Sequence, residues 1–135
     1  MNERCEREVR GLHVFFERWF RGELGDGDFA RVADALASDF ELVSPRGVRD
    51  GRASILAGVR SARGRRGPDF TIAIEDLVVR WQGEDACLVR YEEHQRDGDG
   101  ATARISSAWF RRRDDAPCGV EWVHLHETWL PSGRR

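Results

Sequence analysis

Histidines in the C-terminal half of the sequence are spaced in a way that could bind a metal. His124 and His126 are separated by one residue, so on an extended strand both rings project from the same face, and such a pair can chelate a metal ion. A third ligand would have to come from His94 or His13, and no His and Glu at helical spacing support one. We therefore predict that these histidines pack on a sheet face at a dimer interface, and we predict no metal site and no organic cofactor.

Acidic residues on strand-like segments are the second set of groups that could do chemistry. Alternation places Glu92 on one strand face together with Arg90 and His94, and it places Glu127 on one face of the last strand-like segment together with Leu125. Alternation alone does not decide which face of each strand lies inside the protein, so both assignments stay open at this point.

The composition of the chain excludes several function classes. The 135 residues fit a single domain, residues 1–135, with 34% charged and 40% hydrophobic residues. All 22 basic residues are arginine, which excludes lysine Schiff-base chemistry and a P-loop, and we attribute the missing lysine to genome composition rather than to function. The 24 acidic residues give a net charge of −2, which argues against a nucleic-acid partner.

The cysteines and the apolar segments bear on the compartment. Three scattered cysteines, Cys5, Cys87 and Cys118, make a poor disulfide framework and have no zinc-site spacing, so we expect Cys87 to be a free thiol in the core. The sequence has no apolar signal region near its first residues and no apolar run of 18 residues. These features predict a cytoplasmic protein with no membrane partner.

Helical periodicity dominates the first half of the sequence. Apolar residues recur at helical spacing over about residues 4–24, and a GDGD turn then leads to a second short helix. His13 falls on the apolar stripe of the first helix, so we interpret it as a hydrogen-bonded core or pocket residue rather than a catalytic base. A short strand, Phe40 to Val43, precedes a third helix that opens at Asp50-Gly51.

The second half of the sequence reads as strands joined by short turns. The predicted strands cover about residues 69–81, 85–96, 102–113 and 120–130. Such short connections imply an antiparallel meander. Three helices followed by this meander predict an α+β protein in which the helices pack in a curved, mainly antiparallel sheet.

Three stretches of the sequence carry a family resemblance: GDGDFARVADAL after the first helix, SPRG followed by DGRASILAGVR, and the ending AWFRRRDDAPCGVEWVHLHETW. With the order of the elements, they resemble the nuclear transport factor 2-like superfamily. They are most similar to its SnoaL-like branch, which includes the association domain of calcium/calmodulin-dependent protein kinase. The resemblance covers nearly the whole chain and implies a cone-shaped fold with a pocket, but the fold alone does not name an activity.

The resemblance also implies which residues line the pocket. In the kinase association domain the positions that match Glu92, Ser107 and Glu127 turn inward, but arginines occupy them there. The acidic residues here therefore favour a polar or cationic ligand over an anion. The ligand-binding residues expected on this basis are His13, Trp19, Arg90, Glu92, His94, Ser107, Trp109 and Glu127.

Glu92 and Glu127 are the expected catalytic pair. Two carboxylates in a largely apolar cone repel each other, which raises at least one pKa toward the range of general acids and bases. In the alternative interpretation, Arg90 or Arg104 neutralises them in a buried ion-pair network.

Residues assigned to the outer sheet face predict a homodimer. This interface would contain Tyr91, Trp122, His124 and His126. Because Tyr91 is the single tyrosine and is assigned outward, the chain lacks the oxyanion hole that ketosteroid isomerases need. The leading hypothesis is a homodimer that binds a small molecule in the cone. The alternatives are a cofactor-independent isomerase, cyclase or hydrolase, and an association module without a ligand.

Overall fold

The computed structural model describes residues 1–131 of the protein. The helical elements are α1 (Asn2–Phe20), the 3-10 turn η1 (Asp26–Phe29), α2 (Ala30–Ala33) and α3 (Arg52–Ser61). The strands are β1 (Leu36–Val43), β2 (Arg49–Gly51), β3 (Thr71–Gln82), β4 (Ala86–Asp97), β5 (Gly100–Arg112) and β6 (Val120–Trp129).

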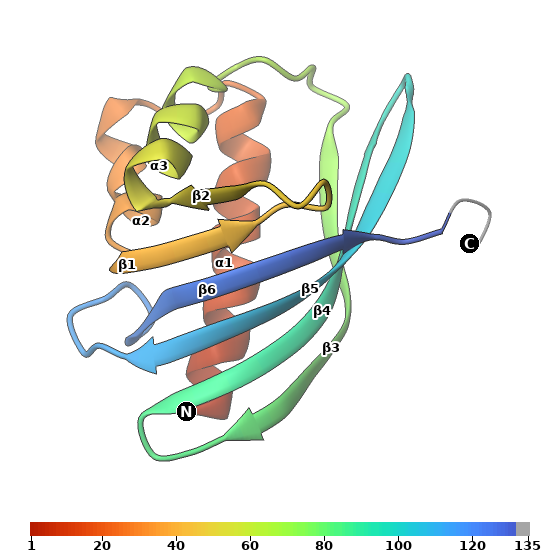
Figure 1. The fold of residues 1–135 in the computed structure, drawn as a ribbon. Helices are drawn as coiled ribbons and strands as arrows, with labels where there is room; N and C mark the ends of the chain where they lie inside the picture. Colours follow the sequence, from red (N-terminus) through yellow and green to blue (C-terminus); the bar gives the residue numbers. More distant parts are fainter. Residues whose placement is uncertain (132–135) are drawn as a thin grey trace.

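One curved sheet forms the wall on which the helices pack. Its strand order is β2-β1-β6-β5-β4-β3, and the helices lie together on one side of it (Figure 1). Strands β3 to β6 form the predicted antiparallel meander, while β1 pairs with β6 in parallel. The α+β class and the mainly antiparallel curved sheet are therefore confirmed.

The amphipathic pattern of α1 fixes its place against the sheet. Its buried residues recur every three or four positions, so they form one stripe along the helix: Cys5, Glu8, Val9, Leu12, His13, Phe15 and Trp19. Gly22 ends the helix, because its φ of 81° is a left-handed conformation and its N–H reaches the carbonyl of Trp19. The helix therefore stops four residues before the predicted Leu24.

Two predictions for the segment after α1 are wrong. The second helix is only a 3-10 turn and one short turn of α2, because β1 begins earlier than expected, at Leu36. Strand β2 was not expected; it pairs with β1 through Asp50 opposite Leu42. The third helix begins beside the expected Asp50-Gly51 start, at Arg52.

Register shifts interrupt the outer strands of the meander. The pairing of β3 with β4 shifts between Glu75 and Val78 and again before Trp81, and Asp76 has a φ of 53°. A further shift between β5 and β6 falls after Trp122, which inserts one extra residue and changes the face from which the following β6 side chains project.

A disulfide joins the first helix to the sheet. Cys5 of α1 and Cys87 of β4 are both fully buried and their sulfur atoms are bonded, while Cys118 is free. The prediction of a free thiol at Cys87 is therefore wrong. Sequence spacing could not show this pair, because 82 residues separate its members and only the packing of α1 on β4 brings them together.

We expect the disulfide to stabilise the fold through the long loop that it closes. A loop of 82 residues corresponds to about 4.5 kcal/mol of free energy from the lost entropy of the denatured state. Cys5→Ser should lower the free energy of unfolding by that order, measured by urea denaturation without reductant. The control is thiol titration of the denatured, unreduced wild-type chain, where one reactive thiol is expected; three thiols would contradict the bond.

Candidate functional site

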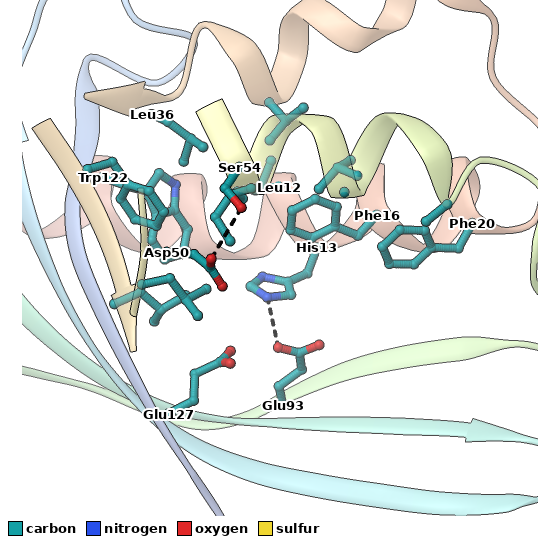
Figure 2. A pocket seen from close by; sticks show the side chains of 18 of the residues that line it. Leu12, His13, Phe16, Phe20, Leu36, Asp50, Ser54, Glu93, Trp122 and Glu127 are labelled. Carbon is teal, nitrogen blue, oxygen red and sulfur yellow. Dashed lines mark hydrogen bonds and ion pairs between the residues drawn. The ribbon is translucent and has the colours of Figure 1, made fainter. Parts of the chain in front are cut away.

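A cavity of about 500 Å³ lies between the helices and the inner face of the sheet. Its walls are mainly apolar, and side chains from α1, α3, β1 and β6 contribute to them (Figure 2). Representative wall residues are Leu12, Phe16, Phe20, Leu36, Ile55 and Trp122. A volume of this size is typical of pockets for small organic molecules.

Polar side chains gather at the sheet side of this cavity. They come from four elements: His13 from α1, Glu93 and Gln95 from β4, Arg104 from β5 and Glu127 from β6. Figure 2 shows Glu93 and Glu127 rising from the sheet toward the cavity, with His13 facing them from the helix. The site therefore combines apolar walls with one polar end.

The His13–Glu93 contact joins α1 to the sheet. His13 Nδ1 lies 2.7 Å from the carbonyl oxygen of Val9, so Nδ1 carries a proton and donates it there. His13 Nε2 lies 3.2 Å from Glu93 Oε1, and both side chains are buried. Since Nδ1 already holds a proton, a hydrogen bond to Glu93 requires a second proton on Nε2 or one on the carboxyl.

Electrostatics favour a charged pair over a neutral one at this contact. Burial by itself would lower the pKa of His13, but the Glu93 carboxylate reverses this effect and raises it. Burial by itself would raise the pKa of Glu93, but the His13 imidazolium, Arg104 and a hydrogen bond from Gln95 lower it to about 2. The raised pKa of His13 and the lowered pKa of Glu93 both favour an imidazolium that faces a carboxylate.

Glu127 differs from Glu93 in that its pKa is raised. Burial raises the pKa of Glu127, and the nearby Glu93 carboxylate raises it further. Arg104, whose Nη1 lies 3.1 Å from Glu127 Oε1, lowers this pKa but does not cancel the effect of burial. A carboxyl with a raised pKa that faces a cavity can exchange a proton with a bound molecule.

Two further polar features were missed by the sequence reasoning. Asp50 of β2 lines the cavity, and it accepts a hydrogen bond from Ser54 of α3 at 3.2 Å. Behind the polar end, the hydroxyls of Tyr91 and Ser106 are buried and have no hydrogen-bond partner among residues 1–131. These two residues are directly opposite each other on β4 and β5.

The structure places the predicted ligand-binding residues in two separate regions. His13 and Glu127 line the cavity. Trp19 is fully buried outside the cavity lining, and its Nε1 donates to the carbonyl of Val59 at 2.7 Å. Five others lie on the opposite, outer face of the sheet: Arg90, Glu92, His94, Ser107 and Trp109.

Those five residues were assigned to the wrong face of the sheet because the inward and outward sets of alternating residues on β4 and β5 were exchanged. The inner face of β4 carries Cys87, Val89, Tyr91 and Glu93, so Glu93 rather than Glu92 meets the cavity. Along β5 the inner set includes Arg104 in place of the expected Ser107. The apolar side chains at alternate β4 positions were a usable signal for this face.

The predicted dimer residues also divide between the two faces. Tyr91 and Trp122 are fully buried on the inner side, so neither can contact a partner chain. Trp122 donates its Nε1 to the buried Glu8 Oε2 at 2.8 Å, and the extra residue that follows it turns His124 and His126 outward. The single tyrosine is therefore inside the protein, contrary to expectation.

No helix within the described part of the chain is long and apolar enough to cross a membrane.

The ion pair between His13 and Glu93 predicts a pH-dependent stability difference. In Glu93→Gln the buried imidazolium has no carboxylate, so we expect the free energy of unfolding to fall by about 3 kcal/mol near pH 5.5. Because the folded pKa of His13 is raised, this loss should shrink as the pH rises above 6.5 and through that pKa. On the acid side, the contribution of Glu93 is lost as the pH falls from 4.5 toward 2.

Urea denaturation from pH 5.5 to 9 measures this difference. Glu84→Gln makes the same chemical change at an exposed position between β3 and β4 and is the matched control. A loss in Glu93→Gln that stays constant across the range would contradict the charged pair.

Comparisons with known proteins place the chain in a family. Residues 5–131 match the family described as sucrose-6-phosphate phosphohydrolase C-terminal. Sucrose-phosphatase 1 of Nicotiana tabacum is 25% identical over 127 residues, and the match covers 91% of this chain but 30% of that protein. The chain thus spans less than a third of the length of the curated relatives that it matches.

Solved structures share the fold. An NTF-2-like protein of unknown function from Pseudomonas aeruginosa is 27% identical, with a TM-score of 0.87 over 95% of this chain and 99% of that one. The hub of the calcium/calmodulin-dependent kinase from S. rosetta is 14% identical, with a TM-score of 0.65 over 95% and 92% of the two chains. The nuclear transport factor 2-like fold predicted from the sequence is confirmed, and the chain belongs to the sucrose-6-phosphate phosphohydrolase C-terminal family.

Proposed function

We propose that the protein binds a small molecule in the cavity between α1, α3 and the sheet. The observation that carries this proposal is a cavity of about 500 Å³ with apolar walls and one charged end. An association module without a ligand would have a cone filled by its own side chains, so the open volume argues against that alternative.

The charges of the cavity define the class of ligand. Three carboxylates, those of Asp50, Glu93 and Glu127, line it together with two cationic side chains. Both cations, His13 and Arg104, are already paired with carboxylates. We infer that the ligand has an apolar body and a head group that donates hydrogen bonds, such as a hydroxyl or an ammonium, and that a phosphate is disfavoured.

The names of the relatives suggest probes rather than a substrate. Sucrose phosphatases are named for a sugar phosphate, but the match covers only 30% of the tobacco protein. Sucrose and sucrose 6-phosphate are therefore useful test ligands. The carboxylate of Asp50 lines the cavity and forms no ion pair within residues 1–131, so it favours the neutral sugar over its phosphate.

Catalysis by a cavity carboxyl is the second candidate function. It rests on the raised pKa of Glu127 and on its position at the cavity wall. Glu127 would act as a general acid or base without a cofactor. The second carboxyl of the catalytic pair would be Glu93, because Glu93 rather than Glu92 lines the cavity. Loss of turnover in Glu127→Gln, with ligand binding retained, would support this candidate.

We further propose that the protein is a homodimer formed through the outer sheet face. Trp81 and Trp109 are 52% and 39% exposed there, and their rings lie 5.6 Å apart. Exposed aromatic pairs of this kind are enriched at protein interfaces. His124 and His126, on the same face, remain candidate interface residues, and Tyr91 and Trp122 do not.

A cytoplasmic location stays a prediction. The Cys5–Cys87 disulfide favours a more oxidising compartment, so the thiol titration described above also bears on this point.

Filling the cavity should abolish ligand binding without unfolding the protein. Gly58 lines the cavity, and a Cβ built on it meets no atom within 4 Å, so Gly58→Leu extends a side chain into open space. We expect at least a tenfold loss of affinity by titration calorimetry for ligands found in a screen of hydroxyl, ammonium and phosphate compounds, with sucrose and sucrose 6-phosphate included.

The matched control is Ala57→Leu, which makes a similar change on an exposed position of α3 outside the cavity lining. Equal affinities in Gly58→Leu and wild type would contradict a ligand site in this cavity. Preferential binding of phosphates would contradict the inferred ligand class.

The dimer proposal predicts a mass of two chains in solution. Trp109→Glu places a charge in the exposed aromatic pair, so we expect this variant to become monomeric while keeping its circular dichroism spectrum. Light scattering across a concentration series measures the mass, and Val14→Glu is a control at an exposed apolar residue of α1. A monomeric wild-type protein would contradict the proposal.

A further inference from the structure

A cluster of three potential metal ligands lies on the outer face of the sheet, away from the cavity. Glu75 projects from β3, and Glu92 and His94 project from β4. His94 Nε2 is 2.9 Å from Glu92 Oε1 and 3.5 Å from Glu75 Oε1, and the three donor atoms all lie within 4.8 Å of one another. The cluster is built on paired strands rather than on a loop.

The pairing of the strands forces the two carboxylates together. Glu75 and Glu92 are direct cross-strand partners, a position at which like charges repel and destabilise a sheet. Arg90 and Arg96 flank the cluster along β4, but among residues 1–131 neither carboxylate forms an ion pair with any arginine. Both carboxylates instead converge on the same nitrogen of His94.

We propose that Glu75, Glu92 and His94 bind a divalent transition-metal ion of the zinc class. Imidazole and carboxylate oxygen are ligands that zinc accepts, and bonds of about 2.0–2.2 Å in a tetrahedron put donor atoms roughly 3.3–3.6 Å apart. The separation of 3.5 Å between His94 and Glu75 lies within that range, and the separation of 2.9 Å between His94 and Glu92 lies below it, so the Glu92 carboxylate must move a few tenths of an ångström away from His94 to admit the ion. A bound cation also removes the repulsion between the two carboxylates.

The position of the cluster leaves room for a fourth ligand. The Glu75 side chain is 58% exposed, while those of Glu92 and His94 are 25% and 16% exposed. One side of the cluster is therefore open to solvent, and water or a group from another molecule completes the coordination shell.

A pair of histidines on the same face, His124 and His126, provides the rival explanation for any metal binding. The rings of His124 and His126 lie 6.3 Å apart on β6, and His124 Nδ1 is 3.4 Å from Glu41 Oε1. This pair lies on a different strand from the proposed site. Substitution of each set separately distinguishes the two locations.

The test uses chelator-treated full-length protein titrated with Zn²⁺ by calorimetry and with Co²⁺ by visible absorption. We expect one ion per chain and a Co²⁺ spectrum of low-coordinate geometry. His94→Ala and Glu75→Gln should each weaken Zn²⁺ binding by at least about tenfold. The paired variant His124→Ala/His126→Ala should bind as wild type does.

Two results would overturn the proposal. One is the absence of Zn²⁺ binding by wild-type protein at 0.1 mM; the other is equal Zn²⁺ affinity in wild type and in His94→Ala. Because the substituted side chains lie on the sheet surface, circular dichroism should show all variants folded, and His94→Gln provides a second variant that keeps a polar side chain at that position.

Discussion

Burial of one stripe of α1 against the inner face of the sheet is the constraint on which the rest of the structure depends. The N-terminal part of the stripe, with Cys5 and Val9, is fully buried. Beside the C-terminal part of this stripe, Phe16 and Phe20 of the same helix are only partly buried and line the cavity together with α3. The helix therefore acts both as core and as cavity wall, and the polar residues of the site occur where the packed part meets the open part.

The buried carboxylates near α1 lie in both parts of the structure, one in the packed core and one at the cavity. Each buried carboxylate near α1 is offset by a cation from a different element: Glu8 by Arg31 and Glu93 by His13. Burial still raises the pKa of Glu8, because the loss of solvation outweighs the opposing effects of Arg31 and of the hydrogen bond from Trp122. Because each pair joins two different elements, its distance depends on how the helices are placed against the sheet. The ion pair that shapes the polar end of the cavity therefore also helps to hold α1 on the sheet.

The long, strongly periodic elements could be predicted from the sequence, but the inward faces of β5 and β6 could not. The stripe of α1 and the four strands of the meander repeat often enough to be recognised. Strand β2 has three residues, too few for a pattern. In β5, both alternate sets contain apolar residues, as Trp109 and Phe110 show, so alternation left the inner face undecided. For β6, the register shift after Trp122 reverses the phase within one strand, which no fixed period can describe.

The irregular register of β3 has a consequence for the behaviour of the protein at high concentration. β3 is an edge strand of twelve residues, and a straight edge of that length is a template for pairing with strands of other molecules. The two register shifts and the left-handed Asp76 break this edge into short pieces, none of which presents a long regular row of free backbone groups. The irregularity that begins directly after Glu75 thus protects the open side of the sheet from polymerisation.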